Sequence, residues 1–162
     1  MDDNALILIV VIAILIIMSA YFSATETAFS SLNKIKLKNL AVNGSKRAES
    51  TLNLAKKFDS ILSTILIGNN IVNIASASIA TIVFTKYYGD AGVTISTIVM
   101  TIVVLIFGEI SPKSLSKESP EKFAMFSTPI LKVLLIIFTP LNFVFGLWKK
   151  AISKVIKVEE IP

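Results

Sequence analysis

The chain has 162 residues, of which 54% are hydrophobic, and its mean hydropathy is strongly positive. It contains no cysteine and no histidine, which excludes disulfide bonds, thiolate metal sites, haem ligation by histidine and histidine-based acid–base catalysis. The formal net charge is +5, but the basic residues flank the hydrophobic runs, where such residues set membrane topology. We therefore expect an all-α integral membrane protein in a lipid bilayer, with no nucleic-acid partner.

Three uncharged runs predict three transmembrane helices, over residues 5–22, 61–84 and 91–107. Each reaches or approaches the roughly 20 residues that a helix needs to cross a hydrocarbon core about 30 Å thick. The flank before the first run is acidic, with Asp2 and Asp3, whereas a signal peptide has a positively charged n-region. We therefore expect the first run to be a retained helix.

Residues 33–58, between the first two runs, are strongly basic, with Glu49 as their single acid. The positive-inside rule places this segment in the cytoplasm, and the N-terminus and the turn at 86–90 outside. Within it we expect two short helices that break at Asn43-Gly44, with Ser45 capping the second.

The apolar stretch 123–148 is cut by Pro129 and Pro140 and carries Lys132 between them. A spanning helix needs about 20 residues, so we expect a proline-bent interfacial, juxtamembrane helix on the cytoplasmic side, ending in an amphipathic helix at the surface. The alternative is a fourth, proline-kinked span with the C-terminus outside.

Glu109 lies at the end of the third run, where a carboxylate at membrane depth is costly unless a partner neutralises it. Pro112 follows three residues later and has no N–H to donate to the carbonyl of Gly108. We therefore expect a broken helix that presents this free carbonyl beside the Glu109 carboxylate. Irregular backbone at membrane depth is tolerated where it lines a cavity, which makes the segment a candidate functional site.

The end of the first run carries Ser19, Ser23 and Glu26, whose spacing of four and three places them on one helix face. Small hydroxyl residues are also ordinary at packed membrane-helix interfaces, so a purely structural role for the serines stays open. Glu26 lies nearer the cytoplasmic end and has the alternative of capping a helix or pairing with a lysine.

The second run contains three amides, Asn69, Asn70 and Asn73, among apolar residues. Asn69 and Asn73 project to the same side of a helix, whereas Asn70 points roughly 100° away. A single asparagine is explained by hydrogen bonding between helices, but three so close together favour a further role.

Together the three runs offer a set of oxygen ligands with one negative charge: Ser19, Ser23, Asn69, Asn73, the carbonyl of Gly108, and Glu109. Hydroxyl, amide, carbonyl and carboxylate oxygens suit Mg²⁺, Ca²⁺ or Na⁺ and do not suit zinc or copper. Mg²⁺ usually keeps several waters, so six protein oxygens would hold an unusually dehydrated ion. The spacing does not decide among these cations.

Three motifs in this order, SAYFSATETA at 19–28, LIGNNIVN at 66–73 and GEISPK at 108–113, carry a family resemblance. From about residue 7 to 157 the chain resembles the transmembrane (DUF21-type) domain of the cyclin M/CorC family of magnesium transporters. The resemblance implies a homodimer with three crossing helices, a cytosolic helix pair and a belt-like juxtamembrane helix. It also implies a multi-pass protein of the cell membrane, with the N-terminus outside and the C-terminus in the cytoplasm.

By this resemblance the activity is Mg²⁺ export from the cytoplasm, in exchange for Na⁺, with alternating access around the ion. The family's ion site maps onto the six residues given above and does not include Asn70. Residues 1–157 then form the transmembrane ion-transport domain, with Pro112 as a hinge. Residues 158–162 begin a linker to cytosolic CBS-type domains that this chain lacks, so we expect no ATP regulation.

Two other classes of function are alternatives to transport. A membrane-embedded Mg²⁺ sensor that regulates another transport system needs the same ion site. An intramembrane hydrolase with Glu109 as its base lacks a nucleophile-and-base pair, and we therefore expect no enzyme.

Overall fold

The computed structural model describes residues 2–156, and all regular secondary structure in that range is helical. The predicted linker at 158–162 lies outside the described residues. Two short irregular elements interrupt the α-helices: η1, a 3₁₀ turn, and η2, a π-helix. The elements in chain order are α1 (Asp3–Ser30), α2 (Lys34–Val42), α3 (Lys46–Ala55), α4 (Phe58–Tyr88), η1 (Gly89–Ala91), α5 (Gly92–Val103), η2 (Val104–Ile110), α6 (Ser111–Glu118), α7 (Pro120–Ile137) and α8 (Thr139–Val155).

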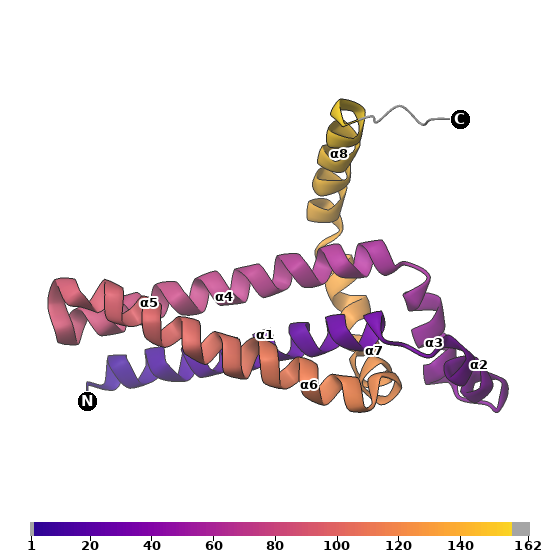
Figure 1. Ribbon diagram of the computed structural model, residues 1–162, viewed down its shortest axis with the longest axis horizontal. Coiled ribbons are helices and arrows are strands. Elements are labelled where there is room, and N and C mark those ends of the chain that lie inside the picture. The colour runs from indigo at the N-terminus through magenta and orange to yellow at the C-terminus, as the bar shows by residue number, and fades with distance from the viewer. Residues whose placement is uncertain (1, 157–162) are drawn as a thin grey trace.

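Two helical stretches are long and apolar enough to cross a membrane, Asp3–Ser30 and Phe58–Glu118. The second doubles back at η1, so that α5 lies alongside α4, and α1 packs against both α4 and η2 (Figure 1). A Cβ atom on Gly92 would lie 2.5 Å from the backbone nitrogen of Thr85, so glycine is required where α5 leaves the turn. Three long limbs therefore lie side by side: α1, α4, and the continuous limb from α5 through η2 to α6.

The first helix and the turn between α4 and α5 are joined at their ends by an ion pair. Lys86 Nζ lies 2.5 Å from Asp2 Oδ2, and this hydrogen-bonded ammonium lowers the pKa of the Asp2 carboxyl. The start of α1 and the α4–α5 turn consequently lie at the same end of the molecule, as the topology prediction requires.

The predicted pair of short helices is confirmed as α2 and α3. The side chain of Asn33 caps α2 by accepting a hydrogen bond from the Lys36 N–H, and Ser45 caps α3 by accepting one from the Ala48 N–H. Gly44, with φ of +101°, makes the turn between them, in the left-handed region that glycine enters freely.

The prediction that both Pro129 and Pro140 interrupt the stretch 123–148 is wrong for Pro129. Helix α7 runs through Pro129, and the bend of 71° falls between α7 and α8, with Pro140 in the first turn of α8. Ala124 and Leu131, on either side of Pro129, are fully buried, and this packing outweighs the one backbone hydrogen bond that proline removes.

Helix α7 packs across α1 and α3, whereas α8 projects away from the other helices (Figure 1). The Tyr21 hydroxyl donates to the Ser127 carbonyl at 3.2 Å, and the hydroxyls of Thr51 and Thr128 lie 2.8 Å apart. None of the described residues of α8 is buried, and Asn142 Nδ2 of α8 donates a hydrogen bond to Thr64 Oγ1 of α4 at 2.9 Å.

Candidate cation site

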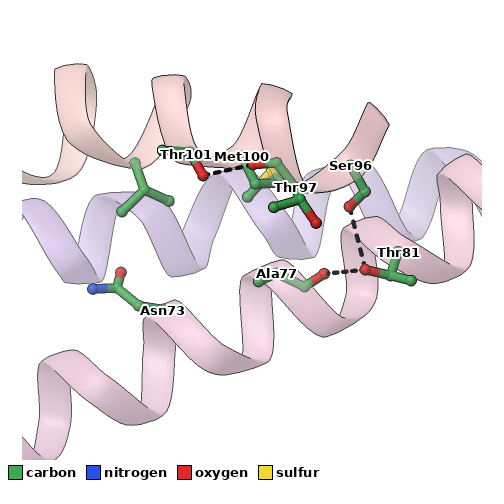
Figure 2. A pocket seen from close by; sticks show the side chains of 8 residues that line it. Asn73, Ala77, Thr81, Ser96, Thr97, Met100 and Thr101 are labelled. Carbon is green, nitrogen blue, oxygen red and sulfur yellow. Dashed lines mark hydrogen bonds between the residues drawn. The ribbon is translucent and has the colours of Figure 1, made fainter. Parts of the chain in front are cut away.

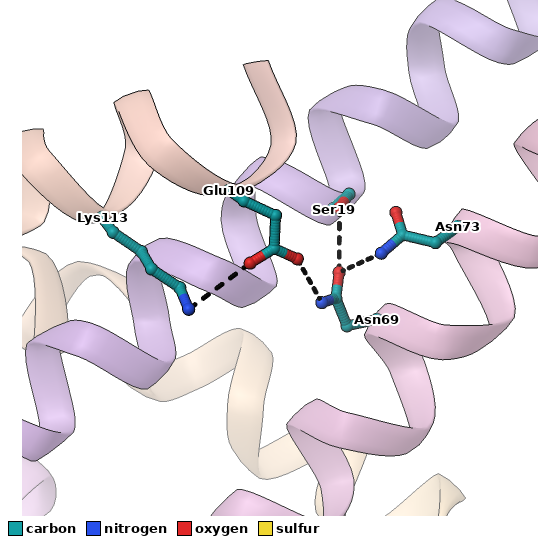
Figure 3. Close-up of polar contacts among 5 residues, drawn as sticks. All are labelled: Ser19, Asn69, Asn73, Glu109 and Lys113. Atoms are coloured by element: carbon teal, nitrogen blue, oxygen red, sulfur yellow. Dashed lines mark hydrogen bonds and ion pairs between the residues drawn. The ribbon is translucent and has the colours of Figure 1, made fainter. Parts of the chain in front are cut away.

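Hydrogen bonds join four of the six predicted ligand residues. Asn69 Oδ1 accepts hydrogen bonds from Ser19 Oγ at 2.8 Å and from Asn73 Nδ2 at 3.3 Å (Figure 3). Asn69 Nδ2 in turn donates to Glu109 Oε1 at 3.1 Å. Asn69 on α4 is therefore the junction between α1 and η2.

The fifth predicted residue, Gly108, is buried against Ser19. A Cβ atom on Gly108 would lie 3.0 Å from Ser19 Oγ, tighter than most real Cβ contacts. Glycine therefore allows the backbone of η2 to approach α1 closely, directly beside the hydrogen-bonded residues.

The sixth, Ser23, lies one helical turn after Ser19 and is fully buried. Its Oγ has no hydrogen-bond partner among residues 2–156. A buried hydroxyl without a partner is costly, and a bound ion or water molecule can supply the contact that it lacks. Ser23 is therefore not part of the hydrogen-bonded network, but its free oxygen suits a ligand role.

The predicted broken helix at Pro112 is wrong, because the chain stays helical from η2 into α6. The irregularity is instead the π-helix, in which the Ser111 N–H donates to the carbonyl of Ile106, five residues earlier. A π-helical turn inserts one residue into the helix and shifts the hydrogen-bond pairing. The helix can therefore continue through Pro112 although proline has no N–H to donate. Such turns recur at functional sites, and a hinge at Pro112 stays a prediction.

Sequence reasoning missed the partner of the Glu109 carboxylate, which is Lys113. Lys113 Nζ lies 3.4 Å from Glu109 Oε2, and the two side chains are 39% and 25% exposed (Figure 3). The signal was present, because residues four apart on a helix are neighbours.

The donor set fits a hard cation held by one carboxylate and neutral oxygens. Among residues 2–156 no group of three or more Asp, Glu, His or Cys side chains is placed to hold a metal. Asn69 Oδ1 already accepts two hydrogen bonds, so a cation at this oxygen must replace at least one of them.

A cavity of about 250 Å³ lies between α4 and α5 (Figure 2). Its lining extends from Asn73 to Thr81 and Ser96, which are closer in the chain to the turn at η1. Asn73 lines it together with hydroxyl residues, and Thr81 Oγ1 and Ser96 Oγ lie 3.3 Å apart across the two helices. The hydroxyl residues that line the cavity are Thr81, Ser96, Thr97 and Thr101. Asn73 lines this polar cavity and also belongs to the hydrogen-bonded network, so the cavity adjoins the network.

Asn70 and Glu26 lie outside the network. Asn70 lines a separate cavity with Phe145 and Trp148 of α8, in agreement with its predicted direction. Glu26 is half-buried and takes part in neither of the two ion pairs found between residues 2 and 156. Pairing with a lysine, one of the alternatives for Glu26, is therefore not seen in that range.

The apolar limbs and the polar network between them define a membrane-embedded helical domain. The sequence model of the cyclin M transmembrane N-terminal domain matches residues 10–161, and the chain belongs to that family. The family resemblance carried by the three motifs is thereby confirmed.

The chain is 42% identical over 149 residues to a UPF0053 protein of Haemophilus influenzae, covering 92% of this chain and 36% of that protein. It is 45% identical over 123 residues to the UPF0053 inner membrane protein YfjD of Escherichia coli, covering 76% of this chain and 29% of that protein. A polyamine export protein of Haemophilus influenzae is 27% identical over 150 residues, covering 85% of this chain and 35% of that protein. The chain thus spans about a third of the length of these relatives.

Proposed function

We propose that this domain exports Mg²⁺ from the cytoplasm in exchange for Na⁺, by alternating access around the network of Ser19, Asn69 and Glu109. The observation that carries the proposal is the convergence of one carboxylate with hydroxyl and amide oxygens from three packed helical limbs. Such a set suits a hard cation, and a carboxylate among apolar helices is a functional-site hypothesis by default.

The proposed unit is a homodimer in the cell membrane, with three crossings per chain, the N-terminus outside and the C-terminus in the cytoplasm. The ion pair between Asp2 and Lys86 supports a location of the start of α1 and the α4–α5 turn on the same side of the membrane, and the positive-inside rule makes that side the outer one. The basic pair of helices α2 and α3 then lies on the cytoplasmic side, together with the bent pair α7 and α8, which we call the α7–α8 elbow. CBS-type domains follow on that side in a full-length protein.

The cavity between α4 and α5 supplies the outer half of the proposed route. It extends from Asn73 toward the turn at η1 and is lined by hydroxyl oxygens that can replace part of an ion's hydration shell. Lys113, at the other side of the site, leads toward the cytoplasmic end of α6.

The proposal is tested with proteoliposomes that contain only this chain. We expect Mg²⁺ flux that responds to an opposing Na⁺ gradient, and we expect Glu109→Gln to abolish both flux and Mg²⁺ binding in a folded protein. Glu118→Gln, an exposed carboxylate on α6, is the matched control and should keep both. Mg²⁺ binding without flux would favour the sensor alternative, and binding unchanged in Glu109→Gln would contradict the site.

We propose a transport role for Glu109 over a catalytic one, because its contacts are an amide and an ammonium, which make no nucleophile-and-base pair. Hydrolysis of a peptide or ester probe by the purified chain, lost in Glu109→Gln, would contradict this choice.

A second candidate substrate is a polyamine. One relative carries that activity in its name, and the Lys113 contact shows that the Glu109 carboxylate accommodates a primary ammonium group. Flux of labelled spermidine that is competitive with Mg²⁺ in the same liposomes would favour this candidate, and spermidine that neither moves nor competes would exclude it.

A further inference from the structure

The carboxylate of Glu109 has both of its oxygens engaged by groups of this chain. Asn69 Nδ2 donates to Oε1 at 3.1 Å, and Lys113 Nζ lies 3.4 Å from Oε2 (Figure 3). Of these two partners, only the ammonium of Lys113 carries a charge. The positive charge of Lys113 therefore balances the negative charge of the Glu109 carboxylate.

Neutrality matters most when no cation is bound. An unpaired carboxylate between membrane helices is costly, so a carrier that releases its ion needs a substitute charge before it can return. Lys113 is placed to supply that charge, because it lies one turn beyond Glu109 on the same continuous limb.

The ammonium of Lys113 can also move away from the Glu109 carboxylate. Its side chain is 39% exposed, and α6 continues toward Lys117 and Glu118, which are exposed. The flexible four-carbon stem of lysine lets the ammonium move from the carboxylate into water without a change in the backbone.

We propose that Lys113 is a tethered counter-ion of the cation site: its ammonium neutralises Glu109 in the ion-free protein and leaves the carboxylate when a cation binds. This inference rests on the proposed function, since it requires that Glu109 bind a cation. The lysine competes with the ion for one carboxylate and repels a bound divalent cation, so it sets the affinity low enough for release.

The test is calorimetric Mg²⁺ binding to the purified chain and to Lys113→Met, which keeps the length and apolar bulk of the stem and removes the charge. Since a partly exposed ion pair is worth about 1 kcal/mol or less, we expect Mg²⁺ to bind about fivefold more tightly to Lys113→Met, which is roughly 1 kcal/mol. Lys117→Met is the matched control, because it removes the same charge from the same helix at an exposed position. Its Mg²⁺ affinity should equal that of the wild type.

A second readout is thermal unfolding without divalent ions. Lys113→Met should unfold at a lower temperature than the wild type, and added Mg²⁺ should stabilise it more strongly than it stabilises the wild type. A merely structural lysine would lower the unfolding temperature without raising the Mg²⁺ affinity.

The outcomes separate this inference from the proposed function. Mg²⁺ affinity that is unchanged or weaker in Lys113→Met overturns the tethered counter-ion and leaves the Mg²⁺ site standing. Absence of Mg²⁺ binding in both proteins overturns the counter-ion and the site together. Tighter binding in Lys113→Met, together with no Mg²⁺ flux from the wild-type chain in liposomes, supports the counter-ion and overturns only the transport proposal.

Discussion

At the scale of single residues, the polar side chains of the site differ in whether they have hydrogen-bond partners. Asn69 uses both ends of its amide to connect Ser19, Asn73 and Glu109. Ser23, on the same helix as Ser19, is equally buried and yet has no partner among residues 2–156. A buried hydroxyl that lacks a partner beside a hydrogen-bonded network is a candidate position for binding an ion or a water molecule.

Substitution of Ser23 tests that interpretation directly. Ser23→Ala removes a buried hydroxyl that lacks a partner, so without divalent ions we expect unchanged or higher stability, by up to about 1 kcal/mol. If Ser23 is a ligand, the same variant should bind Mg²⁺ more weakly. Thermal unfolding in EDTA and calorimetric Mg²⁺ titration are the measurements.

Ser116→Ala is the contrast for this experiment. Ser116 is buried, but its hydroxyl donates to the Ala24 carbonyl at 2.6 Å, so its loss should lower the unfolding temperature and leave Mg²⁺ affinity unchanged. If Ser23→Ala destabilises the protein as Ser116→Ala does and keeps full Mg²⁺ affinity, Ser23 is a packing residue.

At the scale of elements, the π-helix η2 explains how the third limb passes through the site without a break. Its wide turns accommodate Pro112, and its small residue Gly108 lies against α1 at Ser19. Gly108, whose carbonyl lacks its α-helical donor because Pro112 has no N–H, directly precedes Glu109 in this element.

Restoring the missing donor should change the site. Pro112→Ala supplies an N–H that can bond the Gly108 carbonyl, which favours an α-helical turn over the π-helix. We expect Mg²⁺ affinity to fall by at least about tenfold, or roughly 1.4 kcal/mol. Calorimetry at fixed pH and Na⁺ concentration measures the effect.

Pro120→Ala is the control for this substitution, because Pro120 occupies the first position of α7, where an N–H has no helical partner. It should keep the wild-type affinity. Equal affinities for wild type and Pro112→Ala would leave Glu109 as a candidate ligand and remove the helix irregularity at Pro112 from the mechanism.

At the scale of the whole molecule, the three long limbs and the α7–α8 elbow form one arrangement with two distinct ends. The Asp2–Lys86 ion pair lies at the end formed by the α4–α5 turn, and α2, α3 and α7 gather at the other (Figure 1). The bend of 71° sends α8 away from the limbs, as suits a helix at the membrane surface more than a fourth crossing.

The predicted topology is testable with single cysteines, because the chain has none of its own. In intact cells we expect a membrane-impermeant thiol reagent to label Asp90→Cys, at the outer turn, and to spare Asn43→Cys, an exposed position between α2 and α3. Lys150→Cys on α8 decides between the alternatives for the C-terminal part. Protection of Lys150→Cys until the cells are permeabilised is the expected result, and labelling in intact cells would favour a fourth span.

Dimerisation is expected from the family and from small residues on the second and third limbs. Gly92 serves packing within the chain, against the backbone of Thr85, whereas Ala77 and Ser78 are exposed on α4 and remain open to a second copy. Light scattering in detergent should give two chains per particle. A strict monomer in several detergents and in nanodiscs would count against the homodimer.

Local features were predictable because each depends only on near neighbours in the chain. Hydropathy predicts the apolar runs, and turn and capping signals predict the break at Asn43-Gly44 and the cap at Ser45. Helical periodicity predicts that Asn70 points away from Asn69 and Asn73, and the structure agrees with each of these predictions. The six candidate ligands were also chosen on local grounds, as polar groups where burial makes them costly.

By itself, the sequence determined that this chain is a helical membrane domain with one carboxylate and several neutral oxygens on its apolar segments. Only the tertiary structure decided that Asn69 joins three limbs, that Ser23 lacks a partner, that η2 passes Pro112 without a break and that the elbow falls after α7. The physical reason is that hydrogen bonds between helices depend on distances across the fold. The packing that keeps α7 helical through Pro129 also depends on distances across the fold. The hydrophobic periodicity of the sequence does not specify such distances.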